Sequence, residues 1–394
     1  MKILMLHNKY LIPGGEDQCS VAEAALLRDH GHEVELLEES NQRVEQLGQA
    51  RTALRTVWSH ESYRRIDKLL RSTRFDILHV QNFFPLWSPS VYYAASRNHV
   101  PVVQTLHNYR LMCANALLFR DQHLCQECLG RFMPWHGVVH ACYRNSRAAS
   151  AVVASMVGAH RLAGTWRKRV AMYIAVSEFA REIYVAGGLP AEKIAVKPNF
   201  IHPSPEPGAG GGGYALFVGR LSTEKGVTTM LEAWKSAHDP IPLKIAGEGP
   251  LAELVIATAR ERSRVEYLGA KQLQEILDLM RNAEFLLFPS EWYETMGRTI
   301  MEAFAVGTPV VAASIGPPAT MVTPGETGFH FTPGSVAELR ERVEWCSRNL
   351  DQLRAMRGKA RQAFEASYTG SANAAMLLAI YKNAQETAGP SRRS

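Results

Sequence analysis

The chain has 394 residues, of which 46% are hydrophobic and 21% are charged, and its formal net charge is +6 at pH 7. This length indicates two domains, and the composition of an ordinary globular protein excludes a disordered chain, a collagen and a coiled coil. A surplus of six positive charges over so large a surface does not by itself indicate nucleic-acid binding, and we expect no nucleic-acid partner.

The first half of the chain alternates short apolar runs with helical stretches. Residues 2–6 (KILML) have the length of a strand, and a helix is predicted over 16–30, with Gly31 as its C-terminal cap. Further strands are predicted over 75–80, 100–107 and 172–177. Nearly continuous apolar strands separated by helices indicate a parallel sheet that is covered on both faces.

The composition changes at residues 202–213 (HPSPEPGAGGGG), where proline and glycine replace every plausible core residue. The alternation of strands and helices then restarts. The sequence therefore predicts an α/β fold with two Rossmann-like domains facing a central cleft. The predicted parts are an N-terminal domain over 1–200, a linker over 201–213, a C-terminal domain over 214–370, and a helix and tail over 371–394 that pack back on the N-terminal domain.

No apolar run approaches the roughly 20 residues that a membrane-spanning helix needs. The N-terminal apolar stretch is too short for a signal peptide, so we expect a cytoplasmic protein. Residues 144–170 mix basic and apolar side chains. This stretch is either an ordinary domain helix with a solvated end or a segment that lies on anionic lipid at the cytoplasmic face of the inner membrane.

A glycine pair, Gly14-Gly15, follows the first strand and resembles part of a dinucleotide-binding fingerprint. The loop reads GGEDQC, however, and the required G-x-G-x-x-G is absent. A nicotinamide or flavin enzyme is therefore a weak alternative.

The most informative stretch is 288–314 (FPSEWYETMGRTIMEAFAVGTPVVAAS), which places Glu294 in a loop and Glu302 on the following helix. The free N–H groups and the dipole of a helix N-terminus favour negative charge, as in phosphate sites. Two carboxylates beside such a site suit neutral polyols, because each carboxylate accepts hydrogen bonds from adjacent hydroxyls. The backbone amides expected at this helix end are those of Met296, Gly297 and Arg298.

Two further loops lie at predicted strand ends in the second half of the chain. Arg220 and Lys225 flank a turn in FVGRLSTEKG, and an arginine fork with a lysine point charge is a common pairing around a diphosphate. The alternative is that both are ordinary loop cations. Gly247 and Glu248 belong to the glycine-rich loop GEGP, where the lack of side chains allows a ligand to approach closely.

Together, Glu294-x7-Glu302, GRLSTEKG, GEGP and the glycine pair after the first strand resemble glycosyltransferase family 4. The resemblance covers nearly the whole chain, and it implies the GT-B fold and a retaining, nucleotide-sugar-dependent enzyme. It implies that Arg220 and Lys225 hold the donor diphosphate and that Glu302 binds the ribose hydroxyls. The implied catalytic residues are Glu294, which holds hydroxyls of the transferred sugar, and His107, which touches that sugar. The remaining implied donor-binding residues are Gly14, Gly15, Asn199, Gly247, Glu248, Met296, Gly297, Arg298 and Thr299.

The resemblance implies transfer of a hexose-type sugar from a nucleotide diphosphate-sugar to a glycan or polyprenyl-linked acceptor, in cell-surface polysaccharide synthesis. No catalytic metal is required, since Arg220, Lys225 and the helix end can stabilise the leaving diphosphate. Phe200 stands where the family usually has glycine, and Asn108 departs mildly from the usual residue after the histidine. The alternatives are a catalytically silent nucleotide- or glycan-binding protein and a sugar-nucleotide epimerase of the same fold.

Four of the six cysteines lie within thirty residues, in a predicted insertion over about 108–145. Their spacing, with one C-x2-C pair, suits a structural zinc site of four thiolates that braces an acceptor-side loop. An Fe–S centre, a disulfide or unrelated buried thiols are the alternatives. The predicted ligands are Cys113, Cys125, Cys128 and Cys142.

Overall fold

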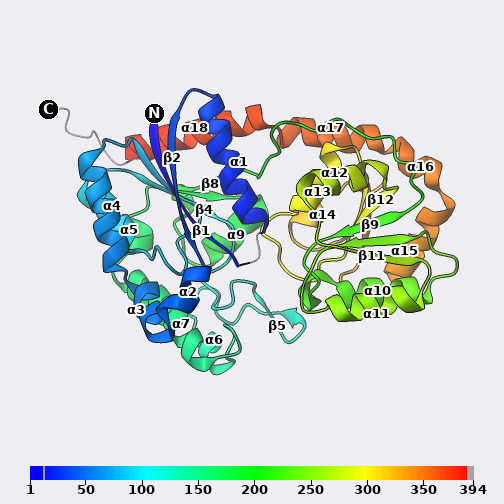
Figure 1. The fold of residues 1–394 in the computed structure, drawn as a ribbon, viewed down its shortest axis with the longest axis horizontal. Coiled ribbons are helices and arrows are strands. Elements are labelled where there is room, and N and C mark those ends of the chain that lie inside the picture. The colour runs from blue at the N-terminus through cyan, green and yellow to red at the C-terminus, as the bar shows by residue number, and fades with distance from the viewer. Residues whose placement is uncertain (12–13, 388–394) are drawn as a thin grey trace. The chain divides into compact units, whose positions relative to one another are not determined.

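The computed structural model describes residues 1–11 and 14–387 and divides the chain into two compact units. Unit 1 consists of Met1–Leu118, Cys125–Asn199 and the C-terminal residues from Ser371 on, and unit 2 of Phe119–Leu124 and Phe200–Gly370. Each unit is built around a six-stranded sheet with helices packed on it (Figure 1). Every strand pair in both sheets is parallel.

The sheet of unit 1 has the strand order β2-β1-β3-β4-β7-β8. Its central strands are buried and mostly apolar because both of their faces are covered. The strands are β1 (Lys2–Lys9), β2 (Glu33–Ser40), β3 (Ile77–Val80), β4 (Val102–Leu106), β7 (Met172–Ala175) and β8 (Ile194–Val196). A short antiparallel hairpin of β5 (Phe119–Arg120) and β6 (His123–Leu124) follows β4 in the chain and is grouped with unit 2.

Several helices of unit 1 begin at serine caps. The hydroxyls of Ser59, Ser146 and Ser177 each accept a hydrogen bond from a backbone N–H in the first turn of α4, α7 and α9, which satisfies one orphan donor per helix. The helices are α1 (Gly15–Asp29), α2 (Gln42–Leu47), α3 (Gln49–Val57), α4 (His60–Ser72), α5 (Ser90–Arg97), α6 (His136–Val139), α7 (Arg147–Leu162), α8 (Thr165–Lys168) and α9 (Glu178–Ala186).

The last helix, α18 (Gly370–Thr387), completes the core of unit 1. Its Leu377 and Tyr381 are fully buried in one cluster with Ile3 and Met5 of β1. The predicted tail over 388–394 lies outside the described residues. Of the helices described, none combines the length and the apolar character that crossing a bilayer demands.

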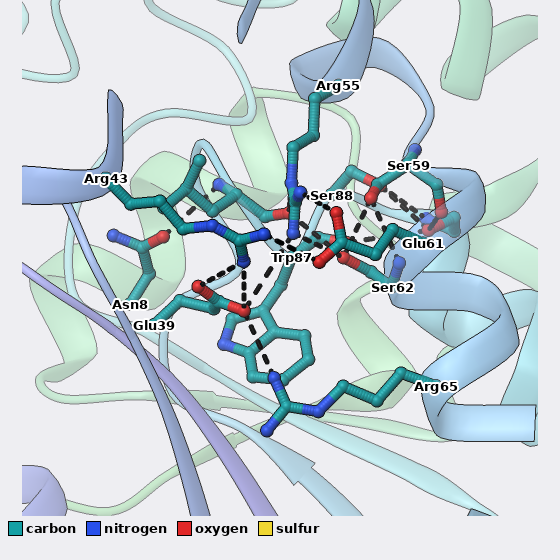
Figure 2. A network of polar contacts seen from close by, with 12 residues as sticks. Asn8, Glu39, Arg43, Arg55, Ser59, Glu61, Ser62, Arg65, Trp87 and Ser88 are labelled. Atoms are coloured by element: carbon teal, nitrogen blue, oxygen red, sulfur yellow. Dashed lines mark hydrogen bonds and ion pairs between the residues drawn. The ribbon is translucent and has the colours of Figure 1, made fainter. Parts of the chain in front are cut away.

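A polar network fixes α2, α3 and α4 to β2 (Figure 2). Glu39 of β2 accepts from Arg43 of α2 and Arg65 of α4, at 3.1 Å each, and lies 3.8 Å from the buried Arg55 of α3. Arg55 also donates to the backbone carbonyl of Leu86 at 2.8 Å. The loop that follows β3 is thereby held in place at Leu86.

The sheet of unit 2 has the order β11-β10-β9-β12-β13-β14. Its strands are β9 (Ala215–Val218), β10 (Leu243–Ala246), β11 (Val265–Gly269), β12 (Phe285–Phe288), β13 (Val310–Ala313) and β14 (Gly328–Phe331). Its helices are α10 (Val227–Ser236), α11 (Ala252–Glu261), α12 (Leu273–Asn282), α13 (Arg298–Ala305), α14 (Pro317–Met321), α15 (Val336–Arg348), α16 (Leu350–Ala355) and α17 (Arg357–Ser367).

The glycine-rich segment that is predicted from the sequence to be a linker forms backbone hydrogen bonds with unit 2. The N–H groups of Gly208, Gly210 and Gly212 donate to backbone carbonyls of unit 2 at 2.9–3.0 Å. A Cβ atom at Gly208 would lie 2.5 Å from the carbonyl oxygen of Arg281. These glycines therefore serve close backbone approach as well as loop conformation.

Candidate functional site

In unit 2 the predicted donor loops lie at the carboxyl ends of three adjacent strands, β10, β9 and β12. On one side of β9 lie β10 and β11, which follow it in the chain, whereas β12 lies next to β9 on its other side. The strand order therefore reverses between β9 and β12, and open parallel sheets bind ligands at such a reversal. The N–H of Leu221 donates to the carbonyl of Glu248 at 2.8 Å, and that of Glu291 to the carbonyl of Glu224 at 2.9 Å. Backbone bonds therefore join the three loops.

Glycine is required where these loops touch. Gly226 has a positive φ of 68°, and a Cβ atom there would lie 1.9 Å from the carbonyl oxygen of Pro289. Gly247 has φ 147°, and its Cβ would lie 1.9 Å from the carbonyl oxygen of Gly219. Any side chain at either position would push the loops apart, because both obstacles are backbone atoms.

The structure brings Lys225 and Glu294 together. Lys225 Nζ lies 2.6 Å from Glu294 Oε1, which also accepts from Ser290 Oγ at 2.6 Å. Glu294 is 6% exposed. The Lys225 ammonium also lies 5.3 Å from the centre of the Trp292 ring, a cation–π distance.

The other predicted cations have carboxylate partners as well. Arg220 forms an ion pair with Glu224, and Arg298 Nε donates to Glu302 Oε1 at 2.8 Å. Burial alone would raise the pKa of Glu224, but the charge and hydrogen bond of Arg220 lower it below its usual value. The predicted cations of unit 2 are thus each paired with a carboxylate.

The start of α13 lies beside these pairs in sequence. Gly297 caps the helix, and its carbonyl accepts from the N–H of Met301 at 3.1 Å. The N–H of Arg298 donates to the carbonyl of Met296 at 3.2 Å, so this amide already takes part in a turn. Thr299 lies in the first turn of the helix.

In unit 1, His107 follows β4 and lines a small pocket with Gln81, Asn108 and Arg110. Its Nε2 lies 2.9 Å from Gln81 Oε1. Burial lowers the pKa of His107 to about 3, so the imidazole is neutral. Gln81 was not predicted from the sequence, because the only sign of its role is its position at the end of strand β3, which lies beside β4 in the sheet.

The glycine pair forms the start of α1. Gly14 is the N-cap, its N–H donates to Asp17 Oδ2 at 2.7 Å, and Gly15 is the first helical residue. Asp17 Oδ1 lies 2.8 Å from His7 Nε2. The loop is thereby tied to β1. Asn199 is the last residue of unit 1 before the chain enters unit 2 at Phe200, which is buried.

Sequence reasoning also missed a carboxyl group that directly follows the glycine pair. Burial raises the pKa of Glu16 to about 7. Tyr10 donates to Glu16 Oε2 at 2.8 Å, and Asn108 Nδ2 lies 3.4 Å from the same oxygen. Within the described residues, Glu16 Oε1 and Arg110 Nε are buried and have no hydrogen-bond partner. Such orphaned polar atoms are typical of a site that receives a ligand or water.

The cysteines of the predicted insertion gather around Cys128. The other three thiols, Cys113, Cys125 and Cys142, each act on Cys128 electrostatically, while burial raises its pKa to about 12. The six cysteines, all in the described part of the chain, form no disulfide. Over 1–11 and 14–387, however, no group of three or more His, Cys, Asp or Glu side chains is arranged so as to hold a metal ion. The zinc site stays a prediction.

Comparison with known structures gives the fold class. A solved structure described as Anabaena Alr3699/HepE in complex with UDP and glucose has a TM-score of 0.66 and 19% identity, and the match covers 97% of this chain and all of that one. The fold is that of GT-B glycosyltransferases, with two parallel-sheet α/β domains, which confirms the predicted fold class.

Comparison of sequences gives the family. The model for Glycosyltransferase Family 4 matches residues 14–204, and that for Glycosyl transferases group 1 matches residues 204–363. The chain belongs to glycosyltransferase family 4, as the sequence predicts.

Two curated relatives show how far the likeness extends. Glycogen synthase of Mycobacterium tuberculosis is 35% identical over 154 residues, which are 38% of this chain and 36% of that protein. Phosphatidyl-myo-inositol mannosyltransferase of Mycobacterium leprae is 27% identical over 255 residues, 62% of this chain and 67% of that protein. The first match thus spans about a third of the relative's length.

Proposed function

We propose that this protein is a retaining glycosyltransferase of hexosyl type that uses a nucleotide diphosphate-sugar. The observation that carries the proposal is the Lys225–Glu294 pair, which lies where the strand order of unit 2 switches direction. Membership of family 4 supports retention, and the UDP and glucose in the description of the HepE structure support the donor class.

The ion pairs of unit 2 explain how the site would accept a donor. A diphosphate offers oxygens that replace a carboxylate on Lys225 and Arg220, and a sugar offers hydroxyls that replace an ammonium on Glu294. Charge that develops on the leaving diphosphate is then stabilised by cations already in place. We therefore propose that the reaction requires no catalytic metal.

Substitutions in unit 2 test this function. In Lys225→Met or Glu294→Gln we expect kcat/KM for nucleotide release to fall at least about 100-fold, the effect of removing one preorganised electrostatic contact. Lys235→Met is the matched control, since Lys235 is 57% exposed and pairs with Glu232 at 3.6 Å. Near-normal turnover in both site variants would overturn the proposal.

A donor panel separates this function from its alternatives. The wild-type chain is assayed with UDP-, GDP-, ADP- and dTDP-hexoses, and the anomeric configuration of the product is read by proton NMR. Retained configuration supports the proposal, and inversion contradicts the retaining mechanism. An epimerised donor indicates an epimerase, whereas binding with no turnover across the panel indicates a silent binding protein.

We also propose a glycan or polyprenyl-linked acceptor in cell-surface polysaccharide synthesis, with unit 1 peripheral on an anionic cytoplasmic membrane face. The named lipid substrate of the mannosyltransferase supports a lipid-linked acceptor. Residues 128–177 contain no Asp or Glu, and their seven basic side chains exceed the net charge of the whole chain. These are Arg131, Arg144, Arg147, Arg161, Arg167, Lys168 and Arg169.

The structure buries most of the apolar side chains of α7 that the sequence offers for such a surface. Val153, Met156 and Val157 are buried in the core. The exposed apolar side chains of this stretch are Phe132 (58%), Trp135 (48%), Val139 (51%) and Leu162 (80%). The first three lie in α6 or just before it, and α6 packs on α7, whose last residue is Leu162. Aromatic side chains with nearby cations are typical of proteins that lie on anionic lipid.

Flotation with phosphatidylglycerol vesicles at low salt tests this surface. We expect the wild-type chain to float and the double variant Phe132→Ser/Trp135→Ser to stay at the bottom. Leu254→Ser is the matched control, because Leu254 is an exposed apolar residue of unit 2. A wild-type chain that does not float would refute the membrane proposal and leave the sugar-transfer proposal unaffected.

The structural zinc at the four cysteines is likewise a proposal. It is supported by the gathering of the thiols and by the N–H of Gly137, which donates to the sulfur of Cys128. Because the side chains are not arranged to hold a metal ion, binding requires them to rearrange. About one zinc per chain in protein purified under reducing conditions, lost in Cys128→Ser, is the expected result. Absence of zinc would remove the proposal.

A further inference from the structure

A chain of buried hydrogen bonds runs from Lys197 to His107 inside unit 1. Lys197 Nζ donates to Glu23 Oε2 at 2.7 Å, and Gln81 Nε2 donates to Glu23 Oε1. Gln81 Oε1 in turn lies 2.9 Å from His107 Nε2. Lys197, Glu23 and Gln81 are 2–4% exposed, so water does not compete for these contacts.

The lysine fixes the direction of every bond in this chain. An ammonium group only donates and an ionised carboxylate only accepts, so Glu23 requires the amide NH2 of Gln81 and rejects its oxygen. The amide oxygen must then face His107. An oxygen acceptor at this place requires the proton on Nε2, and in a neutral imidazole the other nitrogen, Nδ1, is then an acceptor.

The surroundings of His107 keep the ring neutral. Burial lowers its pKa to about 3, and Lys197, His7 and His79 act in the same direction against the carboxylate of Glu23. These groups come from every element that brings charge to the ring: β1, β3, α1 and the segment after β8. Burial lowers the pKa of His79 to about 4, so His79 is neutral at pH 7 and opposes protonation of His107 only in acid.

The far end of the chain is held by the C-terminal helix. Asn373 of α18 accepts from Lys197 Nζ at 2.9 Å, and its own amide donates to the carbonyl of Pro198 at 2.6 Å. Tyr381 Oη lies 2.7 Å from His79 Nδ1. Helix α18 thus orients Lys197, which is connected to His107 in the pocket through Glu23 and Gln81.

We propose that Gln81 is a positioning residue that holds His107 as the neutral Nε2–H tautomer and fixes the orientation of its ring. Both residues line the same pocket. The effect of this orientation on turnover rests on the proposed function. The tautomer is a property of the unliganded protein and is measured without substrate.

The first experiment reads the tautomer. The full chain is labelled with 15N-histidine, and two-bond 1H–15N correlations are recorded at neutral pH; the His107 signals are those that disappear in His107→Gln. We expect the proton on Nε2 in the wild type and a mixture of tautomers in Gln81→Leu. A proton on Nδ1 in the wild type, or an unchanged tautomer in Gln81→Leu, overturns the proposal.

The second experiment reads the consequence for turnover. In Gln81→Leu we expect kcat to fall about 10- to 100-fold, as for other residues that orient an active group. A protonated glutamate has the shape of glutamine, so Gln81→Glu reproduces the contact while its carboxyl is neutral. Burial beside the Glu23 carboxylate raises the pKa of that new carboxyl. The kcat of Gln81→Glu, relative to that of the wild type, is therefore restored at low pH and falls as pH rises.

A merely structural role for Gln81 would not produce this pH dependence. Wild-type kcat in Gln81→Leu, or a Gln81→Glu profile parallel to the wild type, contradicts the positioning role. If the wild-type chain turns over no donor, the proposed function fails, whereas the tautomer measurement still decides the inference. Melting curves of both variants confirm that the folded chain is compared.

Discussion

Each unit contains a lysine–glutamate pair near its candidate site, and the two pairs differ in burial. Lys197 lies 2.7 Å from Glu23 in unit 1, with side-chain exposures of 3% and 5%. Lys225 lies 2.6 Å from Glu294 in unit 2, with exposures of 24% and 8%. Similar distances thus occur in different surroundings.

Because the two pairs differ in burial, they have different roles. A buried pair is costly to break, because each partner would remain as an uncompensated charge. A lysine at the edge of solvent exchanges its carboxylate for another anion at little cost. We infer that the pair in unit 1 is a fixed element of the protein, whereas the pair in unit 2 is replaced by ligand contacts.

The largest expected effect on stability follows from the buried pair. Lys197→Met leaves the carboxylate of Glu23 buried without its cation, and we expect a loss of about 3–5 kcal/mol in the free energy of unfolding. Lys225→Met should cost less, because Lys225 is 24% exposed and the Glu294 carboxylate keeps its hydrogen bond from Ser290. Urea unfolding of both variants measures the two values, and equal losses would contradict the comparison.

A smaller effect follows from Glu16 in unit 1. Its pKa is raised to about 7, above the value of about 4.5 in an unfolded chain, so the folded state binds the extra proton between these two pH values. Stability from this group is therefore present at low pH and is lost as pH rises from about 4.5 to 7, by about 3 kcal/mol. Glu16→Gln should remove this slope, which urea titrations at several pH values would show.

The smallest effect concerns the contact between α18 and β3. Tyr381→Phe removes the hydroxyl beside His79 and should cost about 1 kcal/mol, the usual net value of one hydrogen bond. Tyr63→Phe is the control, since the hydroxyl of Tyr63 accepts from Arg97 at the exposed surface. Thermal melting compares the two, and an equal or larger loss in the control would show that the buried contact adds nothing.

Most of the fold was predictable because its signal is local. Short apolar runs, helical stretches between them and a capping serine before a helix are read within a few residues. The predicted linker was harder to interpret. Its glycines look flexible in sequence, yet Gly208 and Gly212 are needed because backbone carbonyls of unit 2 lie against them.

The candidate site was predictable in unit 2 and only in part in unit 1. Glu294, Glu302, Arg220 and Lys225 belong to motifs with fixed spacing, so a resemblance could find them. Gln81 has no motif. Its role depends on neighbours that the fold supplies.

The sequence by itself determined the alternation of strands and helices, the family and the identity of the charged residues at the strand ends. Only the tertiary structure decided which of these charges pair. Lys225 and Glu294 are 69 residues apart, Gln81 and Glu23 are 58 apart, and Lys197 and Glu23 are 174 apart. The physical reason is that parallel strands bring distant loops to one edge, and burial there decides which charge is fixed and which exchanges.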